Sequence, residues 1–260
     1  MPSIEPTARF TGRVEHYRRH RPGYLAAIVD LLARECGLDN SSVIADIAAG
    51  TGLLAEIFLA RGYRVLAVEP NAEMRASCAT LLTQYPQLRC LEGSAEATGL
   101  PDDSVDLITV GQAMHWFDLK RTRREFARIL HDDGPHLKGW CAVIYNNRRM
   151  GGDAFHDGYE KILVDFGNDY ATVKTSHLTE DRLAAFFTPN AMHCGVFENA
   201  QQLTLEALEG RILSSSYMPQ AGHPRYAAMS AAIEKLFDEN QTAGHVRLEY
   251  ECVVSYGQLT

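Results

Sequence analysis

Two acidic residues, Asp46 and Glu69, each stand directly after a short apolar run, and small residues form a turn between them. The runs, residues 43–45 and 65–68, are short enough to be buried parallel strands, and a helical pattern over residues 53–60 connects them. The order of strand, glycine-containing turn, helix, strand and acid is typical of a βαβ unit that holds a nucleoside at its carboxyl edge.

The turn between the two predicted strands consists of Ala48, Ala49, Gly50, Thr51 and Gly52. Side chains this small let the backbone approach a ligand closely, and the first amides of the next helix would face that ligand. Glu69 ends the second strand, where a carboxylate can accept hydrogen bonds from both ribose hydroxyls. We therefore expect Ala48, Gly50, Thr51, Gly52 and Glu69 to bind the nucleoside part of a cofactor.

Two classes of cofactor are compatible with this turn, because residues 50–55 (GTGLLA) also satisfy the GxGxx(G/A) pattern of dinucleotide-binding enzymes. Asp46 distinguishes them. A dinucleotide would place its pyrophosphate at the turn, where the Asp46 carboxylate repels it. S-adenosylmethionine carries a sulfonium and an ammonium instead, which a carboxylate attracts. The sequence thus favours S-adenosylmethionine and leaves a nicotinamide-dependent oxidoreductase as the weaker alternative.

The residues after the second strand continue the predicted cofactor site. Pro70 and Asn71 follow Glu69 directly, and Asn71 can cap a helix over residues 72–82. Met74 in that helix either covers the adenine or is part of the core, and a methionine at helical spacing fits both uses. A third strand over residues 88–92 leads to Ser94, Ala95 and Glu96. We expect these three residues at the adenine edge, with a solvent-exposed loop acid as the alternative for Glu96.

A fourth strand, residues 105–110, ends in Gln112, Ala113, His115 and Trp116. The carboxyl ends of parallel strands meet at one edge of a sheet, and ligands bind there in open α/β folds. We expect Gln112 and Ala113 to contact the cofactor and Trp116 to form a pocket wall. His115 is the predicted general base or hydrogen-bond partner of the substrate.

A polar helical segment at residues 12–21 carries Tyr17 and Arg21, and Pro22 then forces a break before an amphipathic helix over residues 24–36. Two interpretations stay open for Tyr17, Arg21 and Tyr24: a solvated surface helix, or a lid that closes over the cofactor.

Beyond a predicted helix at residues 118–130, a fifth strand at residues 139–146 precedes a run of further elements. The pattern predicts helices at residues 154–166, 179–187, 205–216 and 224–239, and strands at residues 193–203 and 246–256. The last strand alternates like an antiparallel one. We expect a lid at residues 1–40, a cofactor-binding core at 41–149, and cap helices and closing strands of the same domain at 150–260.

Composition narrows the function classes further. A formal net charge of −8 without a basic run argues against nucleic-acid binding. The six cysteines include no CxxC pair, so reduced thiols are expected. No apolar run suggests a signal peptide or a membrane span, which makes the cytoplasm the expected compartment. Residues 131–136 (HDDGPH) resemble a metal cluster only in composition, since their Asp-Gly-Pro core favours a turn, and no metal is expected. The sequence gives no prediction of the oligomeric state.

With these motifs in view, nearly the whole chain resembles a class I S-adenosylmethionine-dependent methyltransferase of the small-molecule branch. Residues 46–52 (DIAAGTG) are similar to the superfamily's first motif, DxGxGTG, with Ala48 in place of the first glycine. Residues 69–71 match its acidic motif, residues 94–96 its adenine-side loop and residues 112–117 its fourth-strand motif. The resemblance implies a seven-stranded Rossmann-like sheet with an antiparallel last strand, and ribose contact by Glu69.

A more specific resemblance lies outside these motifs. Residues 10–13 with Tyr17, residues 21–24 (RPGY) and residues 213–219 (LSSSYMP) are similar to a bacterial and fungal group that includes trans-aconitate methyltransferase-like proteins. The group implies that Tyr17 and Arg21 cover the cofactor and that the Ser-Tyr segment belongs to a cap near the pocket. The residues expected on the substrate side are Tyr24, His115, Trp116, Asn146, Arg148, Ser216 and Tyr217.

The predicted reaction is methyl transfer to an oxygen of a small molecule. A hydroxyl acceptor would need a base, for which His115 is the candidate, whereas a carboxylate acceptor would need a cation such as Arg21 or Arg148. A nucleoside-binding regulatory protein without turnover is the alternative from another class. Methylation of nucleic acid or protein is disfavoured by the acidic charge.

Overall fold

The structure is a computed structural model of the 260-residue chain, and it describes residues 14–131, 139–170 and 179–259. Residues 1–13 of the predicted lid and residues 132–136 of the predicted turn therefore lie outside the described residues. The strands are β1 (Val43–Ile47), β2 (Arg64–Val68), β3 (Leu88–Leu91), β4 (Leu107–Gly111), β5 (Trp140–Arg148), β6 (His193–Leu203) and β7 (Val246–Gln258).

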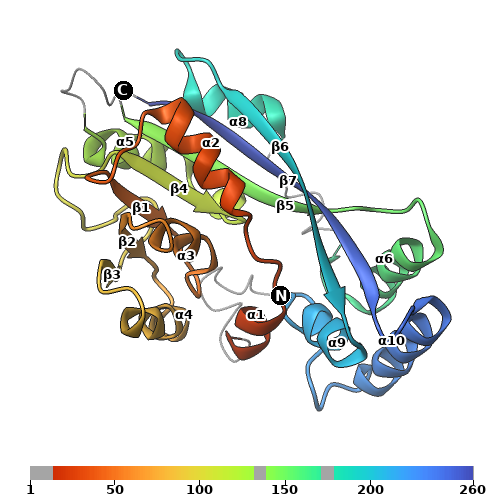
Figure 1. The fold of residues 1–260 in the computed structure, drawn as a ribbon. Coiled ribbons are helices and arrows are strands. Elements are labelled where there is room, and N and C mark those ends of the chain that lie inside the picture. The colour runs from red at the N-terminus through yellow and green to blue at the C-terminus, as the bar shows by residue number, and fades with distance from the viewer. Residues whose placement is uncertain (1–13, 132–138, 171–178, 260) are drawn as a thin grey trace.

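These strands form one sheet in the order β3-β2-β1-β4-β5-β7-β6 (Figure 1). Strands β1 to β5 are parallel to one another, and β7 runs antiparallel to both β5 and β6. The predicted seven-stranded sheet with an antiparallel last strand is confirmed. Strand β6 has the predicted bounds, whereas regular pairing of β4 begins at Leu107 because Val105 makes only an isolated bridge to Leu130.

The helices flank the sheet or extend beyond one end of it. They are α1 (Val14–His20), α2 (Ala26–Cys36), α3 (Leu53–Leu59), α4 (Ala72–Ala79), α5 (Leu119–Ile129), α6 (Ala154–Phe166), α8 (Glu180–Phe187), α9 (Leu205–Leu213) and α10 (Tyr226–Asn240), with short 3-10 helices at Thr80–Thr83 and Met114–Trp116. Asn71 and Asp118 cap α4 and α5 through their side chains, as their sequence positions predict. Helix α9 ends three residues earlier than predicted, because Ser214 bonds back to the Arg211 carbonyl and the chain turns.

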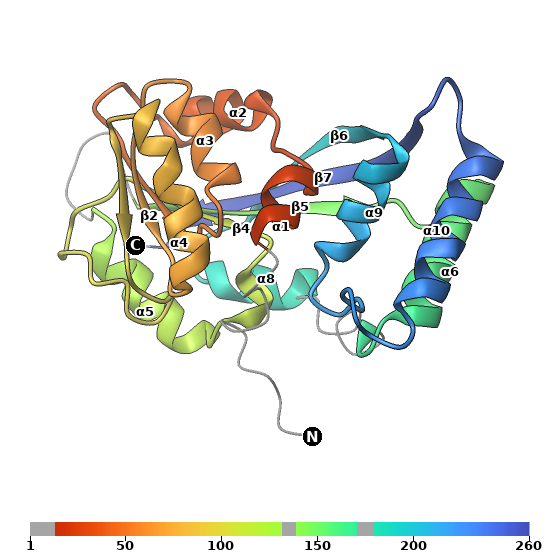
Figure 2. The ribbon, with the colours of Figure 1, turned by 90° about the horizontal axis from the view of Figure 1, so that it is seen from below.

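Two apolar cores cover the two faces of the sheet. One includes Ile28 and Phe58 from α2 and α3, and the other includes Phe126 and Phe187 from α5 and α8. Figure 2 shows the two helix layers on opposite sides of the strands. Burial of large apolar side chains on both faces, at about 25 cal/mol per Å² of apolar surface, is the main force that holds these layers together.

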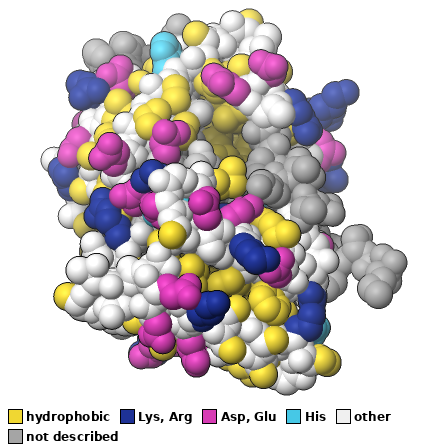
Figure 3. Space-filling view, turned by 90° about the vertical axis from the view of Figure 1, so that its right-hand side faces the viewer, with side chains coloured by type: hydrophobic (Ala, Val, Ile, Leu, Met, Phe, Trp, Pro, Cys, Tyr) yellow, Lys and Arg dark blue, Asp and Glu magenta, His cyan; other side chains and the backbone are white. Residues whose placement is uncertain are grey.

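A third core lies where β6 and β7 extend past the parallel strands. It joins α6, α9 and α10 to the far ends of those two strands, through residues such as Tyr159, Ile212, Ile233 and Leu248. We call α6, α9 and α10 the cap. Figure 3 views the molecule from this side and shows acidic and basic side chains interspersed over the visible face. None of the helices in the described residues combines the length and the apolar character that crossing a bilayer requires.

Candidate functional site: a cleft at the carboxyl ends of β1, β2 and β4

Strand order reverses at β1, because β2 and β3 follow it on one side while β4 and β5 follow on the other. The chain therefore leaves β1 and β4 in opposite directions and opens a crevice beyond their carboxyl ends, the usual ligand site of a doubly wound sheet. Two connected hollows occupy this crevice, and they share Tyr17, Ala48, Gly111 and Gln112 as lining residues. We call the hollow next to Glu69 the nucleoside half and the hollow next to Asp46 the methionine half.

The turn after β1 adopts left-handed backbone angles, with φ of 56° at Ala48, 57° at Gly50 and 87° at Gly52. A Cβ on Gly52 would lie 2.9 Å from the Cys78 sulfur, so only glycine fits there. Ala48 holds the same kind of conformation with a side chain, which costs roughly 1–2 kcal/mol relative to a right-handed residue. The substitution for the motif's first glycine therefore leaves the turn conformation in place at the expense of local strain.

Glu69 closes the nucleoside half and is held by backbone amides. Its Oε2 accepts a hydrogen bond from the Gly50 amide at 2.9 Å, and its Oε1 accepts one from the Asn71 amide at 2.8 Å. These bonds fix the carboxylate between the turn and the start of α4, although burial raises the pKa of Glu69 above its usual range. Each oxygen keeps a second lone pair for a ligand hydroxyl.

The remaining wall of the nucleoside half is mainly apolar. It consists of Pro70, Asn71, Met74, Ala113, Trp116 and Phe117. Met74 is buried and also faces this hollow, so the two interpretations of its position, core and pocket wall, coexist. The empty space in this half, including the open mouth, is about 660 Å³.

Asp46 lies in the methionine half with a different set of contacts. Its side chain is almost fully buried, and Thr109 donates a hydrogen bond to Oδ1 at 2.9 Å. Among the described residues Oδ2 has no hydrogen-bond partner. Burial raises the pKa of Asp46 to about 7, against the lowering effect of the Thr109 bond. A buried oxygen without a partner costs free energy unless a ligand supplies a donor.

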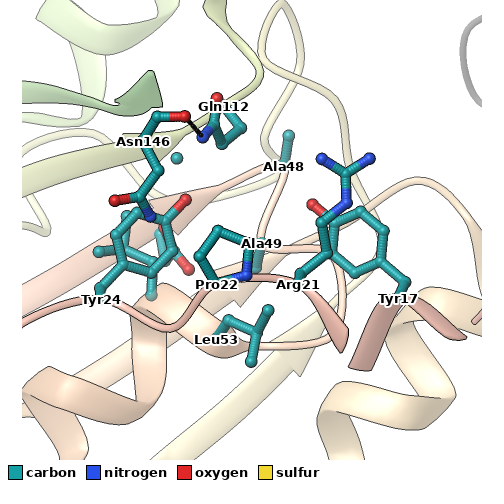
Figure 4. Close-up of a pocket in the computed structure, with 12 residues that line it drawn as sticks. Tyr17, Arg21, Pro22, Tyr24, Ala48, Ala49, Leu53, Gln112 and Asn146 are labelled. Atoms are coloured by element: carbon teal, nitrogen blue, oxygen red, sulfur yellow. Dashed lines mark hydrogen bonds between the residues drawn. The ribbon is translucent and has the colours of Figure 1, made fainter. Parts of the chain in front are cut away.

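Arg21 lines the same half, and its guanidinium lies over the Tyr17 ring, 4.9 Å from the centroid (Figure 4). One nitrogen, Nη2, donates to the Ser214 carbonyl of the cap at 3.1 Å, while Nε is buried without a partner among the described residues. Burial lowers the pKa of Arg21, and the nearby charge of Arg211 lowers it further. Of the two interpretations of the N-terminal segment, this geometry favours the lid.

Only α1 and the residues directly after it act as a lid here, because α2, also within the predicted lid, packs in a core on one face of the sheet. From here on, lid means residues 14–24, and it rests mainly on the cap. Helix α1 has no buried residue of its own, and the His20 ring packs on Gly210 so closely that a Cβ there would lie 2.2 Å from it. Gln201 in β6 donates to the His20 carbonyl at 3.1 Å. These contacts place Tyr17 and Arg21 above the turn after β1.

The methionine half also contains polar groups from the fourth and fifth strands. Gln112, with a φ of 59°, donates from its amide to the Asn146 carbonyl at 3.1 Å (Figure 4). The Tyr24 hydroxyl would lie 2.6 Å from a Cβ on Gly111, so glycine at this position leaves room for the phenol. Gln112, Asn146 and Tyr24 thus converge next to Asp46, as expected of residues at one sheet edge.

His115 lies in the 3-10 helix that precedes α5, and it does not line either half of the cleft. Its Nδ1 lies 3.2 Å from the Tyr145 hydroxyl, and its ring packs on Trp116 with 4.6 Å between centroids. Tyr145 comes from β5 and its burial raises the pKa of its phenol to about 12. A neutral phenol beside Nδ1 can hold the imidazole in one orientation, so Nε2 is the nitrogen that a base would use.

Several predicted site residues lie away from the two hollows. Ala95 is packed in a sheet-face core, Ser94 pairs with Ala97, and Glu96 accepts a hydrogen bond from the Asp118 amide at 3.0 Å. Glu96 therefore already has a structural task at the start of α5. Thr51 is buried in the turn, and its hydroxyl has no partner among the described residues.

On the cap side, the Arg148 guanidinium forms an ion pair with Glu160 and lies 4.7 Å from the Tyr159 ring centroid. Tyr217 packs against Tyr170 with 5.1 Å between ring centroids, and Ser216 precedes it after the end of α9. Neither Ser216 nor Tyr217 lines the two hollows described above, so contact with a substrate stays a prediction for both.

Sequence reasoning did not single out six residues that line the cleft: Pro22, Ala49, Leu53, Leu54, Gly111 and Phe117. All six adjoin a residue that was predicted or belong to its motif. Their position in the sequence was the available signal. Residues that follow a strand end or neighbour a predicted site residue can line the crevice even when their side chains carry no reactive group.

The sequence of residues 45–137 matches the model of the methyltransferase domain. Within these residues the chain therefore carries a methyltransferase domain. The chain is 38% identical over 139 residues to an uncharacterized methyltransferase of Mycobacterium tuberculosis, and this match spans 54% of the chain and 52% of that relative. It spans about half the length of the curated relatives that it matches at 32–38% identity.

Two further similarities extend over most of the chain. A Mycobacterium tuberculosis protein named as a probable S-adenosylmethionine-dependent methyltransferase is 24% identical over 242 residues, 90% of the chain and 80% of that protein. A solved structure from Anaeromyxobacter dehalogenans, described as a type II methyltransferase, superposes with a TM-score of 0.65 at 21% identity. It covers 92% of this chain and 98% of the other, and shows the shared fold.

The cofactor expected from the sequence and from the methyltransferase domain is S-adenosylmethionine, and the cleft fits it on independent grounds. The nucleoside half has an acid positioned for ribose hydroxyls. The methionine half has a buried carboxylate oxygen and a buried guanidinium nitrogen without partners among the described residues. An amino-acid group with an ammonium and a carboxylate complements this pair of opposite charges. In contrast, the Asp46 carboxylate disfavours a pyrophosphate at this turn.

Metal binding was not expected from the sequence. Within residues 14–131, 139–170 and 179–259, no group of three or more His, Cys, Asp or Glu side chains is placed to hold a metal ion. All six cysteines are free thiols.

Proposed function

We propose that this protein transfers a methyl group from S-adenosylmethionine to an oxygen, either a carboxylate or a hydroxyl, of a small molecule. The observation that carries the proposal is the pair of unpartnered opposite charges, Asp46 Oδ2 and Arg21 Nε, in a cleft roofed by the lid. The roof supports a small acceptor, because Tyr17, Arg21 and Pro22 cover the side from which a polymer would approach.

Bound S-adenosylmethionine supplies an electrophilic methyl group, which an acceptor oxygen attacks as the carbon–sulfur bond breaks and S-adenosylhomocysteine is released. Asp46 and Arg21 would fix the amino-acid end of the cofactor, and Glu69 would fix its ribose. Holding two reactants in line can supply about 7–11 kcal/mol of the activation barrier. The lid would exclude water from the cleft, which strengthens the contacts of both charged side chains.

His115 would take the proton from a hydroxyl acceptor, with Tyr145 as the positioning residue that orients its ring. A carboxylate acceptor is already ionised at neutral pH and would need no base. The effect of His115→Ala on kcat therefore separates the two acceptor types: a loss of about 10²–10⁴-fold assigns a hydroxyl, and an unchanged kcat assigns a carboxylate.

Calorimetric titration with S-adenosylhomocysteine tests the foundation of the proposal. Micromolar or tighter binding is expected, and NAD should not compete with it. Transfer of a radiolabelled methyl group from S-adenosylmethionine to a panel of small hydroxy and carboxylic acids then tests turnover. Binding without any transfer would support the regulatory alternative, and the absence of S-adenosylhomocysteine binding would overturn the proposal.

A further inference from the structure

A second buried guanidinium lies immediately behind the lid. Arg211, in the last turn of α9, is 7% exposed. Its Nε donates to the Tyr250 hydroxyl at 3.0 Å, and its Nη1 donates to the hydroxyls of Ser214 and Ser215, both at 3.4 Å. All these partners are uncharged. No carboxylate of the described residues forms an ion pair with Arg211, in contrast to most charged side chains buried to this degree.

Arg211 and Arg21 flank a single residue, Ser214. The Ser214 carbonyl accepts a hydrogen bond from Arg21, and the Ser214 hydroxyl accepts one from Arg211. Two like charges are thus buried side by side, at the junction of the lid and the cap. An isolated buried charge costs several kcal/mol unless an opposite charge compensates it. The dipole of α9 offsets only a small part of this cost for a cation at its carboxyl end.

Another buried arginine of the same region has a carboxylate partner, as buried charges usually do. Arg148 is buried to a similar extent, at 10% side-chain exposure, and it has the Glu160 carboxylate as its partner. The carboxylate of the cofactor accounts for Arg21 under the proposed function. The single positive charge of Arg211 is then left over. It is separated by Ser214 alone from Arg21, which lines the cleft, and it lies among hydroxyl groups that can share hydrogen bonds with a bound oxyanion.

We propose that Arg211 binds a carboxylate of the methyl acceptor and so selects small anionic acceptors over neutral ones. This inference rests on the proposed function and names its substrate class. One unpaired guanidinium matches a monoanionic group, whereas a phosphate dianion would leave a net negative charge in the junction. Three hydroxyls orient the Arg211 guanidinium, those of Ser214, Ser215 and Tyr250. Arg21 adds a second positive charge to the electrostatic potential at this junction.

Thermal unfolding tests the inference with the chain saturated with S-adenosylhomocysteine. The probes are small mono- and dicarboxylic acids, each paired with its primary amide at matched ionic strength, together with inorganic phosphate. The expected result is that at least one carboxylate raises Tm while its amide does not, since a ligand stabilises the state it binds. Arg211→Gln should abolish that rise, and Arg211→Lys should retain part of it because the charge remains.

Two controls separate binding from folding. Tyr250→Phe removes a partner of Arg211 but keeps its charge, so the preference for carboxylates over amides should survive any change in Tm. Arg61→Gln removes one positive charge from an exposed ion pair with Asp30 and should leave the carboxylate response unchanged. Calorimetry of Arg211→Gln should show S-adenosylhomocysteine affinity within about 3-fold of the parent chain.

The outcomes are distinct. If no carboxylate stabilises the parent chain more than its amide, if phosphate alone does so, or if Arg211→Gln keeps the carboxylate response, the inference is wrong. In each of those cases, S-adenosylhomocysteine binding together with methyl transfer to any acceptor of the panel would leave the proposed function in place. Loss of S-adenosylhomocysteine binding by the parent chain itself would instead remove the proposed function on which the inference depends.

Discussion

Glu69 and Asp46 stand at the carboxyl ends of neighbouring strands, yet their carboxylates meet different surroundings. Both oxygens of Glu69 accept hydrogen bonds from backbone amides, whereas one oxygen of Asp46 is buried without a partner among the described residues. The nucleoside half of the cleft is therefore complete before a ligand arrives. In the methionine half, a carboxylate and a guanidinium are buried with one polar atom each that lacks a hydrogen-bond partner in the described part of the chain, which costs free energy. A zwitterionic ligand would supply the missing partners.

Burial of a carboxylate therefore has opposite consequences in the two halves of the cleft. Glu69 ties the turn after β1 to the start of α4 and so contributes to the fold. Asp46 lowers the stability of the ligand-free chain and contributes to binding. Functional residues commonly lower the stability of the ligand-free protein while they increase its affinity for the ligand.

The largest expected effect is that of Asp46→Asn. S-adenosylhomocysteine should bind about 100-fold more weakly, because the amide no longer offsets the ligand's ammonium charge. At pH 8 and without ligand, the variant should unfold at a higher temperature than the parent chain, because the buried ionised carboxylate is gone. Calorimetry and thermal unfolding measure the two effects. Adenosine, which lacks the amino-acid group, should bind both chains equally.

Glu69→Gln is the matched variant in the nucleoside half of the cleft. It should weaken adenosine as well as S-adenosylhomocysteine, and it should lower the free energy of unfolding by about 1–2 kcal/mol, because an amide nitrogen would face a backbone donor. The contrast between the two halves fails if Asp46→Asn destabilises the ligand-free chain as much as Glu69→Gln does.

The next effect is a pH dependence that only the methionine half should show. The folded chain raises the pKa of Asp46 from 3.8 to about 7, so its ionisation disfavours folding. The free energy of unfolding of the ligand-free chain should therefore fall as pH rises from about 4 to about 7, by up to about 4 kcal/mol from this group. Asp46→Asn should lose that slope.

The affinity for S-adenosylhomocysteine should change in the opposite direction with pH. Below about pH 7 the ligand's ammonium must displace the Asp46 proton, so Kd should rise about tenfold for each unit of pH lost. Calorimetry in buffers of different ionisation enthalpy should detect the release of up to one proton. A proton release that persists in Asp46→Asn would assign it to another group.

The smallest expected effect concerns the turn that the two halves share. Ala48→Gly relieves about 1–2 kcal/mol of left-handed strain but costs about 0.4–1 kcal/mol of unfolded-state entropy. A net stabilisation of up to about 1 kcal/mol should result, measured by urea unfolding. Ala49, which lacks a positive φ, is the control, and Ala49→Gly should only destabilise. Equal losses in both variants would show that Ala48 is not strained.

The sequence was sufficient to predict the sheet, its antiparallel closing strand and the capping residues Asn71 and Asp118, because these follow from local periodicity and local hydrogen bonding. It also predicted several of the residues that line the crevice, such as Asp46, Glu69 and Gln112, since parallel strands share one carboxyl edge. The position of Glu96 could not be predicted, because its partner is an amide on a segment distant in sequence. Arg211 was missed for a related reason: an arginine late in a helix usually lies in solvent, and only packing against β7 buries it.

The docking of α1 on α9 has a consequence for how such proteins diversify. Gly210 accommodates the His20 ring, and Arg21 bonds to the chain just past α9, so the lid is shaped to one particular cap. A cap without a glycine at the position of Gly210 would clash with the His20 ring. Replacing the cap of this protein would therefore require a change in the N-terminal segment as well, although the two segments are distant in the chain.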